Sequence, residues 1–340
     1  MDSRVSGGTG PLAGTKLIAG SGRSGTTWVQ DALADANRLR PVFEPLHPRV
    51  SPVGARYAHR AIGAEESHPE LEQFLDEACA GTRERFWTQY RCQRGFLLPT
   101  RDDLRTYAGA AGLAHRWRKF VAEVPGLARV SVRREPLVKC IWANLLLGWL
   151  SRRCGFRVVL IVRHPGAVVE SEHRNVWSAR STLDRMRRDR RLHELTDGRY
   201  LRLLGGTLTP IEEFAALWVI ENQWNLETAS RNGVTVVFYE RLKAMHEPEW
   251  QKLRIALDLP RLPDASRLAR PSQQSAPQNS DTASATAERP RWLLALSGDE
   301  KGRVQGVLDQ VNFRQYSMSD PSPCVAEVGA GYLAPQAASS

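Results

Sequence analysis

A glycine-rich loop near the start of the chain has the residue types that bind phosphate. It runs from Gly20 to Thr27 (GSGRSGTT) and follows a short apolar segment at residues 16–20. From Thr26 onward apolar residues recur at helical spacing, which predicts the order strand, loop, helix. Backbone N–H groups of such a loop, together with the N-terminus of the helix, form a binding site for a phosphate group.

The loop differs at one position from that of proteins that hydrolyse ATP or GTP. Their loop, G-x-x-x-x-G-K-[ST], has a lysine that reaches the β- and γ-phosphates. Gly20 and Gly25 have this spacing, but Thr26 stands in the lysine position and Arg23 lies in the middle of the loop. The pattern therefore disfavours hydrolysis of a nucleoside triphosphate. The alternative interpretation is an ordinary glycine-rich turn.

A second segment with phosphate-binding residue types follows the most apolar predicted strand, residues 157–162 (RVVLIV). It begins at Arg163 and reaches Ser171 eight residues later (RHPGAVVES). An arginine offers a phosphate a fixed, charged fork of donors, and a serine two turns into the next helix adds a hydroxyl. Alone, an ion-paired arginine and a serine bonded to the backbone would explain this pattern better. The glycine loop upstream reverses that preference.

Together the two motifs resemble those of sulfotransferases that use 3′-phosphoadenosine 5′-phosphosulfate (PAPS). In that family the loop [KR]-S-G-[TS]-[TS] binds the 5′-phosphosulfate. The residues that match it are Arg23, Ser24, Gly25, Thr26 and Thr27. The family binds the 3′-phosphate with an arginine at a strand end and a serine eight residues later, and Arg163 and Ser171 have that spacing. The RHP…S form is similar to bacterial members.

The resemblance also implies which groups act on the reacting atoms. Arg23 would neutralise charge on the leaving oxygens, and Lys139 (in PLVK) would hold the sulfonate. In the cytosolic small-molecule type the base is a histidine two residues after this lysine, but Ile141 stands there. In carbohydrate- and tyrosine-modifying relatives the base is a glutamate past the loop, which Glu44 matches, with His47 in reserve. The alternative for Glu44 is a loop carboxylate paired with an arginine.

Two later segments follow the family in order. Residues 239–242 (YERL) are similar to a segment that we interpret as structural, and residues 291–292 (RW) to a stretch that closes over the cofactor. The resemblance covers about residues 15–315, and only the two cofactor motifs are specific. It implies no metal requirement, because the leaving group is a single phosphate already held by the loop.

The elements that must position these residues are short apolar runs that alternate with helical segments. This predicts an α/β chain, a P-loop-like three-layer fold with a mainly parallel central sheet covered on both faces. The expected strands are residues 16–20, 128–132, 136–139, 157–162 and 234–239. The expected helices include residues 26–36, 70–79, 141–150, 214–230 and 292–311.

One sulfotransferase domain is expected at residues 15–318, after a flexible arm at 1–14 and before a disordered tail at 319–340. Within the domain, residues 50–125 are polar and interrupted by glycines, which predicts a helical insertion that faces the acceptor. Residues 270–290 are of low complexity and predict a flexible loop.

Composition limits the choice of compartment and partner. The 340 residues carry 47 Lys+Arg against 37 Asp+Glu, a net charge of +10 that suits an anionic partner. Five scattered cysteines without a CxxC pair argue against disulfides and structural zinc, so a reducing cytoplasm is expected. No apolar run approaches the ~20 residues of a transmembrane helix. The arginine cluster at residues 185–191 fits an acidic glycan or a membrane surface less well than a solvated helix face.

These observations predict a cytoplasmic, PAPS-dependent O-sulfotransferase that acts on a hydroxyl of a carbohydrate or glycolipid. A small-molecule or tyrosine hydroxyl is the alternative acceptor, and a degenerate P-loop small-molecule kinase the alternative enzyme. Nucleic acid is not an expected partner, because no aromatic–basic recognition motif is present. Neither the acceptor's identity nor the oligomeric state can be read from the sequence.

Overall fold

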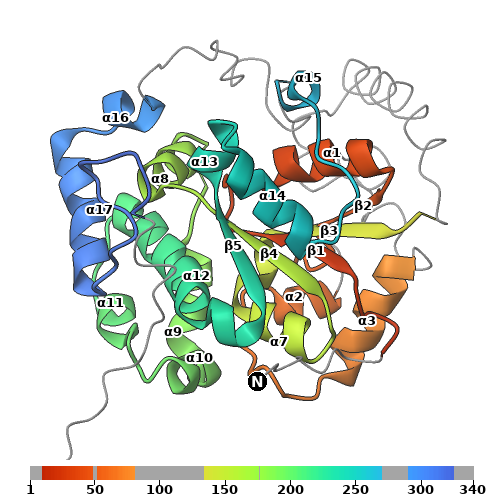
Figure 1. Cartoon of the computed structure of the whole chain (residues 1–340). Helices are drawn as coiled ribbons and strands as arrows, with labels where there is room; N and C mark the ends of the chain where they lie inside the picture. Colours follow the sequence, from red (N-terminus) through yellow and green to blue (C-terminus); the bar gives the residue numbers. More distant parts are fainter. Residues whose placement is uncertain (1–9, 49–51, 81–133, 176, 270–289, 325–340) are drawn as a thin grey trace, which may run out of the picture.

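A central parallel sheet of five strands organises the computed structural model, which describes residues 10–48, 52–80, 134–175, 177–269 and 290–324 (Figure 1). The strand order is β2-β3-β1-β4-β5, and every neighbouring pair is parallel. The strands are β1 (Lys16–Ala19), β2 (Arg40–Phe43), β3 (Pro136–Cys140), β4 (Arg157–Val162) and β5 (Val234–Phe238). The predicted α/β class is confirmed.

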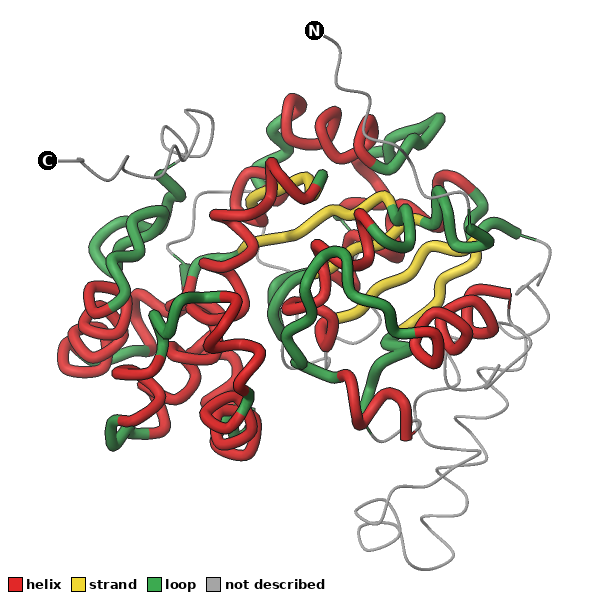
Figure 2. The backbone as a smooth tube through the Cα atoms, turned by 90° about the horizontal axis from the view of Figure 1, so that it is seen from below, coloured by secondary structure: helices red, strands yellow, loops and turns green. Residues whose placement is uncertain are grey.

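Helices cover both faces of this sheet, as the view from below also shows (Figure 2). The described helices are α1 (Thr26–Asn37), α2 (Pro52–Tyr57), α3 (Pro69–Ala80), α7 (Leu147–Arg152), α8 (Pro165–Arg174), α9 (Arg180–Arg188), α10 (Arg190–Leu195), α11 (Leu201–Gly205), α12 (Pro210–Asn232), α13 (Tyr239–Lys243), α14 (Glu247–Ala256), α15 (Ala265–Leu268), α16 (Arg291–Ala295) and α17 (Gly298–Gln310).

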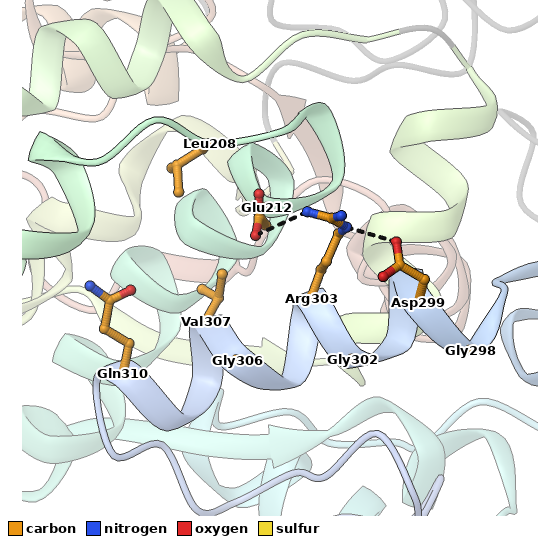
Figure 3. A pocket seen from close by; sticks show the side chains of 9 residues that line it. All are labelled: Leu208, Glu212, Gly298, Asp299, Gly302, Arg303, Gly306, Val307 and Gln310. Carbon is orange, nitrogen blue, oxygen red and sulfur yellow. Dashed lines mark hydrogen bonds and ion pairs between the residues drawn. The ribbon is translucent and has the colours of Figure 1, made fainter.

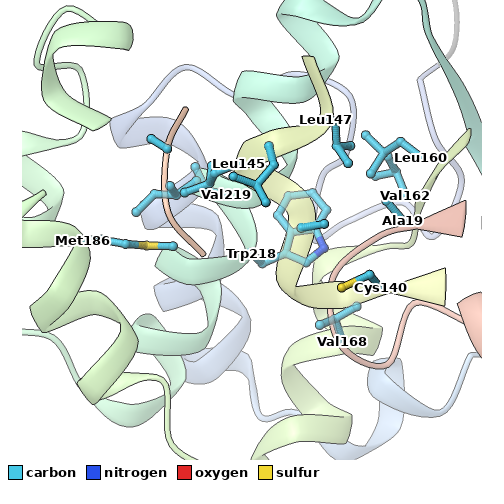
Figure 4. Close-up of a cluster of buried hydrophobic side chains, with 14 of the residues drawn as sticks. Ala19, Cys140, Leu145, Leu147, Leu160, Val162, Val168, Met186, Trp218 and Val219 are labelled. Carbon is cyan, nitrogen blue, oxygen red and sulfur yellow. The ribbon is translucent and has the colours of Figure 1, made fainter. Parts of the chain in front are cut away.

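Alternate strand residues face two separate hydrophobic cores. Ile18 of β1 packs in one core with α1 and α14, where Trp28 and Trp250 meet edge to face. Leu17, on the opposite face of β1, joins the larger core formed with α7, α8 and α12. Trp218 of α12 lies in the middle of this second core (Figure 4). Because both faces are covered, the inner strands are mainly apolar, as expected of a parallel sheet, and each also contains one basic residue: Lys16, Lys139 or Arg157.

Strand β2 was not among the elements expected from the sequence. It has four residues, RPVF, and contains Pro41, which cannot donate a backbone hydrogen bond. The structure places β2 at the sheet edge, beside β3 alone, where a proline is tolerated. This edge strand positions Glu44, the residue that follows it.

The helix expected at residues 141–150 begins as a 3₁₀ helix, η1 (Ile141–Leu146), and becomes α-helical only at α7. Side-chain amides occupy two of its carbonyl groups. Asn144 Nδ2 donates to Ile141 O at 3.0 Å, and Asn225 Nδ2 donates to Asn144 O at 2.7 Å. These bonds compete with regular α-helical pairing at the start of the segment.

Several predicted segments lie wholly or partly outside the described residues. They are the strand at residues 128–132, most of the insertion at 50–125, all but the last residue of the loop at 270–290 and the first nine residues of the arm. At the other end the described chain passes residue 318 and continues to Cys324, whose N–H donates to Gln315 O at 2.9 Å. Among the described residues, no helix is long and apolar enough to cross a membrane.

Candidate functional site

All the candidate residues gather at the carboxyl edge of the sheet. The glycine loop follows β1 and Arg163 follows β4, while Lys139 lies near the end of β3 and Glu44 follows β2. Tyr239 follows β5. In open α/β sheets this edge is where ligands bind, so five segments that are distant in sequence contribute to one region.

The glycine loop has the backbone of an anion cradle. Arg23 and Gly25 both adopt left-handed conformations, with φ of 62° and 83°, and Gly25 caps the N-terminus of α1. A side chain on Gly20 would come within 2.5 Å of Ile161 O, and one on Gly25 would strike the ring of Tyr239. These glycines are therefore required by close packing and, at Gly25, by the positive φ, and left-handed residues of this kind occur in phosphate-binding nests.

The two sequence motifs meet in the structure. Arg23 Nε donates to Ser171 Oγ at 2.8 Å, and a guanidinium nitrogen of Arg163 donates to Arg23 O, also at 2.8 Å. The Arg163 guanidinium lies 4.4 Å from the centre of the Tyr239 ring, the same ring that packs on Gly25. We call Arg23, Arg163, Ser171 and the loop from Gly20 to Thr27 the anion corner.

Positive charge predominates in the anion corner. Burial lowers the pKa of Arg23 from its ordinary value, and the neighbouring charges of Arg163 and Arg174 lower it further. Ionised carboxyl groups at Glu172 and Glu170 would oppose this shift to a smaller extent. A bound anion would relieve the repulsion between the guanidinium groups, so the corner is electrostatically suited to phosphate or sulfate.

Glu44 and Lys139 meet at a second place on the same edge, which we call the ion-pair corner. Their side chains form a salt bridge, and they are only 3% and 4% exposed. The second carboxylate oxygen of Glu44 accepts the Ile141 N–H at 2.9 Å, and the Lys139 ammonium lies 4.5 Å from the Phe43 ring centre. Glu44 is thus paired with a lysine and a backbone donor, not with an arginine.

The rings of two histidines pack edge to face with Trp142, which follows Ile141 of the ion-pair corner in the sequence. The ring of His47, the reserve base, is 5.1 Å from Trp142, and that of His59 is 4.9 Å from it. His59 Nδ1 contacts Glu221 Oε1 of α12 at 2.9 Å, with both side chains buried. The sequence showed no partner for His59, because Glu221 is brought to it only by the tertiary fold.

Helix α12 also contributes a polar face that sequence reasoning missed. Asn222 Nδ2 donates to Ser21 Oγ in the glycine loop at 2.8 Å, and Glu221 acts electrostatically on Glu172 of α8. The available signal was the run Glu221, Asn222, Gln223 and Asn225 within a helix that is otherwise apolar. Polar residues buried in such a helix need partners, and here they include the loop.

The RHP turn that carries Arg163 is fixed by the end of the described chain. His164 stacks on Trp292 at 4.2 Å, and its Nε2 is 3.1 Å from both Ser317 O and Asp320 O. The His164 backbone N–H donates to Glu240 Oε1 at 2.8 Å. Burial lowers the pKa of His164 to about 4, so the ring is neutral near pH 7.

A cavity of about 600 Å³ lies away from this edge, between α17 and the start of α12 (Figure 3). Arg303 crosses it, 2.8 Å from Asp299 and 3.8 Å from Glu212. None of the residues that line it belongs to either corner. Among the described residues, no group of three or more His, Cys, Asp and Glu side chains could hold a metal ion.

The arginine cluster at residues 185–191 is partly paired with carboxylates. Arg187 pairs with Asp184 at 2.9 Å, and Arg191 pairs with Glu66 at 2.5 Å and with Glu194 at 3.0 Å. Within the described part of the chain, this partial pairing is compatible with the solvated-face interpretation.

Comparisons with protein-family models and with curated proteins found no match to the chain. A search of solved structures found the "Sulfotransferase Domain from the Curacin Biosynthetic Pathway", with a TM-score of 0.40 and 17% sequence identity. That alignment covers 89% of this chain and 98% of the other.

Proposed function

We propose that this protein is a PAPS-dependent sulfotransferase, which moves the sulfuryl group from PAPS to an acceptor hydroxyl. The observation that carries the proposal is the meeting of the two motifs. Arg23 is hydrogen-bonded to both Ser171 and Arg163, although they lie more than a hundred residues away in the sequence. A kinase loop would need a lysine where Thr26 stands.

The anion corner would hold the two phosphate-bearing ends of the nucleotide. The backbone N–H groups of the loop, with the Ser24, Thr26 and Thr27 hydroxyls, are suited to the 5′-phosphosulfate. Arg163 and Ser171 are suited to the 3′-phosphate. Each now bonds to Arg23, so binding would exchange contacts within the protein for contacts with the nucleotide.

The ion-pair corner supplies the groups for transfer. The acceptor oxygen bonds to sulfur as the bond from sulfur to the phosphate oxygen breaks, and adenosine 3′,5′-bisphosphate leaves with that electron pair. Arg23 stabilises the charge on the leaving oxygen. Lys139 turns from Glu44 to the sulfonate, which frees a Glu44 oxygen to take the acceptor's proton. His47 is the alternative base.

The proposed acceptor is a carbohydrate or glycolipid hydroxyl, because Glu44 and not a histidine near Lys139 matches the expected base. A small-molecule or tyrosine hydroxyl is the alternative acceptor. The proposed location is the cytoplasm. The free thiols of Cys79, Cys140 and Cys154 are buried, and burial raises the pKa of the Cys79 and Cys154 thiols to about 12, which makes these two thiols poorly reactive.

Calorimetric titration with adenosine 3′,5′-bisphosphate, and separately with ATP plus magnesium, tests the proposal. We expect the bisphosphate to bind and Arg163→Ala to lose about 1.5–3 kcal/mol of binding, or roughly 10- to 150-fold in affinity. Arg190→Ala is the matched control, because that side chain is 93% exposed. Binding of Mg-ATP without detectable binding of the bisphosphate would favour a kinase instead.

A further inference from the structure

Glu172 is a buried carboxyl group that lies directly against the glycine loop. It follows Ser171 on α8, and it is 7% exposed. A Cβ atom on Gly22 would come within 2.7 Å of Glu172 Oε1 and 3.4 Å of the Trp177 ring. The carboxyl group therefore occupies the space that a side chain on the loop would fill, at the rim of the anion corner.

The carboxyl group of Glu172 has no hydrogen-bond partner among the described residues. Its neighbour two positions earlier, Glu170, differs in this respect, since it pairs with Arg174 at 2.9 Å and with Arg291 at 3.3 Å. Two charged groups act on the pKa of Glu172 in opposite directions, Glu221 of α12 and Arg23 of the loop. His59 lies beyond Glu221, which it contacts at 2.9 Å.

These surroundings favour the neutral acid. Burial raises the pKa of Glu172 well above its ordinary value, the negative charge of Glu221 raises it further, and Arg23 opposes them to a smaller extent. A neutral carboxylic acid has one O–H to donate, and no described residue accepts it. A hydrogen-bond acceptor on a ligand could accept the O–H of Glu172.

We propose that Glu172 binds the nucleotide as a neutral carboxylic acid and donates its O–H to a phosphate or sulfonate oxygen held in the glycine loop. The inference rests on the proposed function for the identity of the nucleotide. It adds to that function a ligand-binding group that no motif contains. An ionised carboxylate in this place would repel the anion, so ligand binding and the proton on Glu172 are coupled.

The coupling has a definite sign. A bound anion makes the proton on Glu172 harder to remove, so the complex takes up a proton wherever the free protein has lost it. Affinity then falls as pH rises through the pKa of Glu172 in the free protein, by up to about tenfold per pH unit. The ligand's phosphates titrate near pH ~6 and must be separated from this effect.

Calorimetry with adenosine 3′,5′-bisphosphate between pH 6 and 9, in two buffers of different ionisation enthalpy, measures both affinity and proton uptake. We expect the wild-type protein to lose affinity with rising pH and to take up as much as one proton. Glu172→Gln keeps a neutral donor of the same shape, so it should retain the low-pH affinity and lose the protein-dependent part of the pH profile. Glu170→Gln is the matched control and should keep the wild-type profile.

An identical pH profile and identical proton uptake in the wild-type protein and Glu172→Gln would overturn the inference. Tighter binding by Glu172→Gln at every pH would also do so, since it would show an ionised, repelling carboxylate. Infrared spectroscopy gives a test that needs no ligand. We expect the wild-type protein to show a band of a protonated carboxyl group that Glu172→Gln lacks. If the wild-type protein lacks this band near neutral pH, the inference is contradicted.

The outcome also separates the inference from the proposed function. If the bisphosphate binds without the Glu172 signature, the inference fails and the function stands. If the bisphosphate fails to bind, inorganic pyrophosphate is titrated instead. If pyrophosphate binds with a pH dependence that Glu172→Gln removes, the nucleotide is rejected as the ligand, and the neutral form of Glu172 as a donor is retained. If neither ligand binds, both proposals are rejected.

Discussion

The anion corner and the ion-pair corner differ in how their buried charges are balanced. In the anion corner, Arg23 and Arg163 lie close together and are linked through a backbone carbonyl, so positive charge is left over. In the ion-pair corner, Glu44 and Lys139 neutralise each other and are almost fully buried. The anion corner can therefore bind an anionic ligand as it stands. In the ion-pair corner the charges already balance, so Glu44 and Lys139 must separate before either can contact the substrates.

Glu44→Gln should give the largest effect, because it removes the proposed base while leaving the anion corner intact. We expect turnover to fall by about 10²–10⁴-fold. Affinity for adenosine 3′,5′-bisphosphate should stay near the wild-type value. The measurement uses labelled PAPS with a panel of sugar, phenol and peptide acceptors. If turnover survives, His47 or the substrate itself takes the proton.

Lys139→Ala tests whether the ion-pair corner is self-contained. The substitution leaves a buried, uncompensated Glu44 carboxylate, which should lower the free energy of unfolding by about 3–5 kcal/mol. The double variant Lys139→Met with Glu44→Leu should recover most of that loss, because an apolar pair leaves no buried charge. Arg23→Ala, in the corner with excess positive charge, should destabilise much less in the same urea titrations. Equal losses at both corners would remove the distinction between them.

Acid should loosen the anion corner through His164. Its pKa is near 4 in the folded protein and near 6.5 when unfolded, so the stability that depends on a neutral ring is present above pH ~6.5 and is lost as pH falls towards 4. Between pH 7 and pH 5 we expect a loss of about 2 kcal/mol. Urea titrations of wild type and His164→Asn measure it, and the exposed His173→Asn serves as control. A wild-type loss no larger than that of His164→Asn would contradict this prediction.

The smallest expected effect is that of a chelator. Neither corner, as proposed, uses a metal ion, so transfer from labelled PAPS should proceed at the same rate with and without EDTA. Loss of activity in EDTA that magnesium restores would mean that the negative charge of the bound nucleotide is balanced by a metal cation as well as by the arginines of the anion corner.

The sequence predicted the structure of the anion corner better than that of the ion-pair corner, and the reason is physical. The glycine loop and its helix are encoded locally by residues 20–36, and the structure has both. The Glu44–Lys139 pair depends on the register of β2 against β3, in which Phe43 lies opposite Lys139. Strand β2 is short, contains a proline and was missed, so both residues were predicted as functional but their pairing was not.

Glu172 and His59 show the same limit more strongly. Glu221 of α12, far along the chain, contacts His59 and acts electrostatically on Glu172. No spacing rule links α8, α12 and His59, which lies two residues after α2, because side-chain orientation on a buried helix is decided by packing. A single sequence shows that α12 has a run of polar residues, but it does not show which parts of the fold their side chains face.

The central position of β1 also bears on how the chain acquires its shape during synthesis. β1 is made first, yet its partners in the sheet are β3 and β4, more than a hundred residues later. The contact that shields Gly25 comes from Tyr239, later still. Such non-local pairing is slow to form. An emerging N-terminal fragment would hold the whole glycine loop without any of the segments that shape it, so we expect competence to bind the bisphosphate to appear only once β5 has left the ribosome.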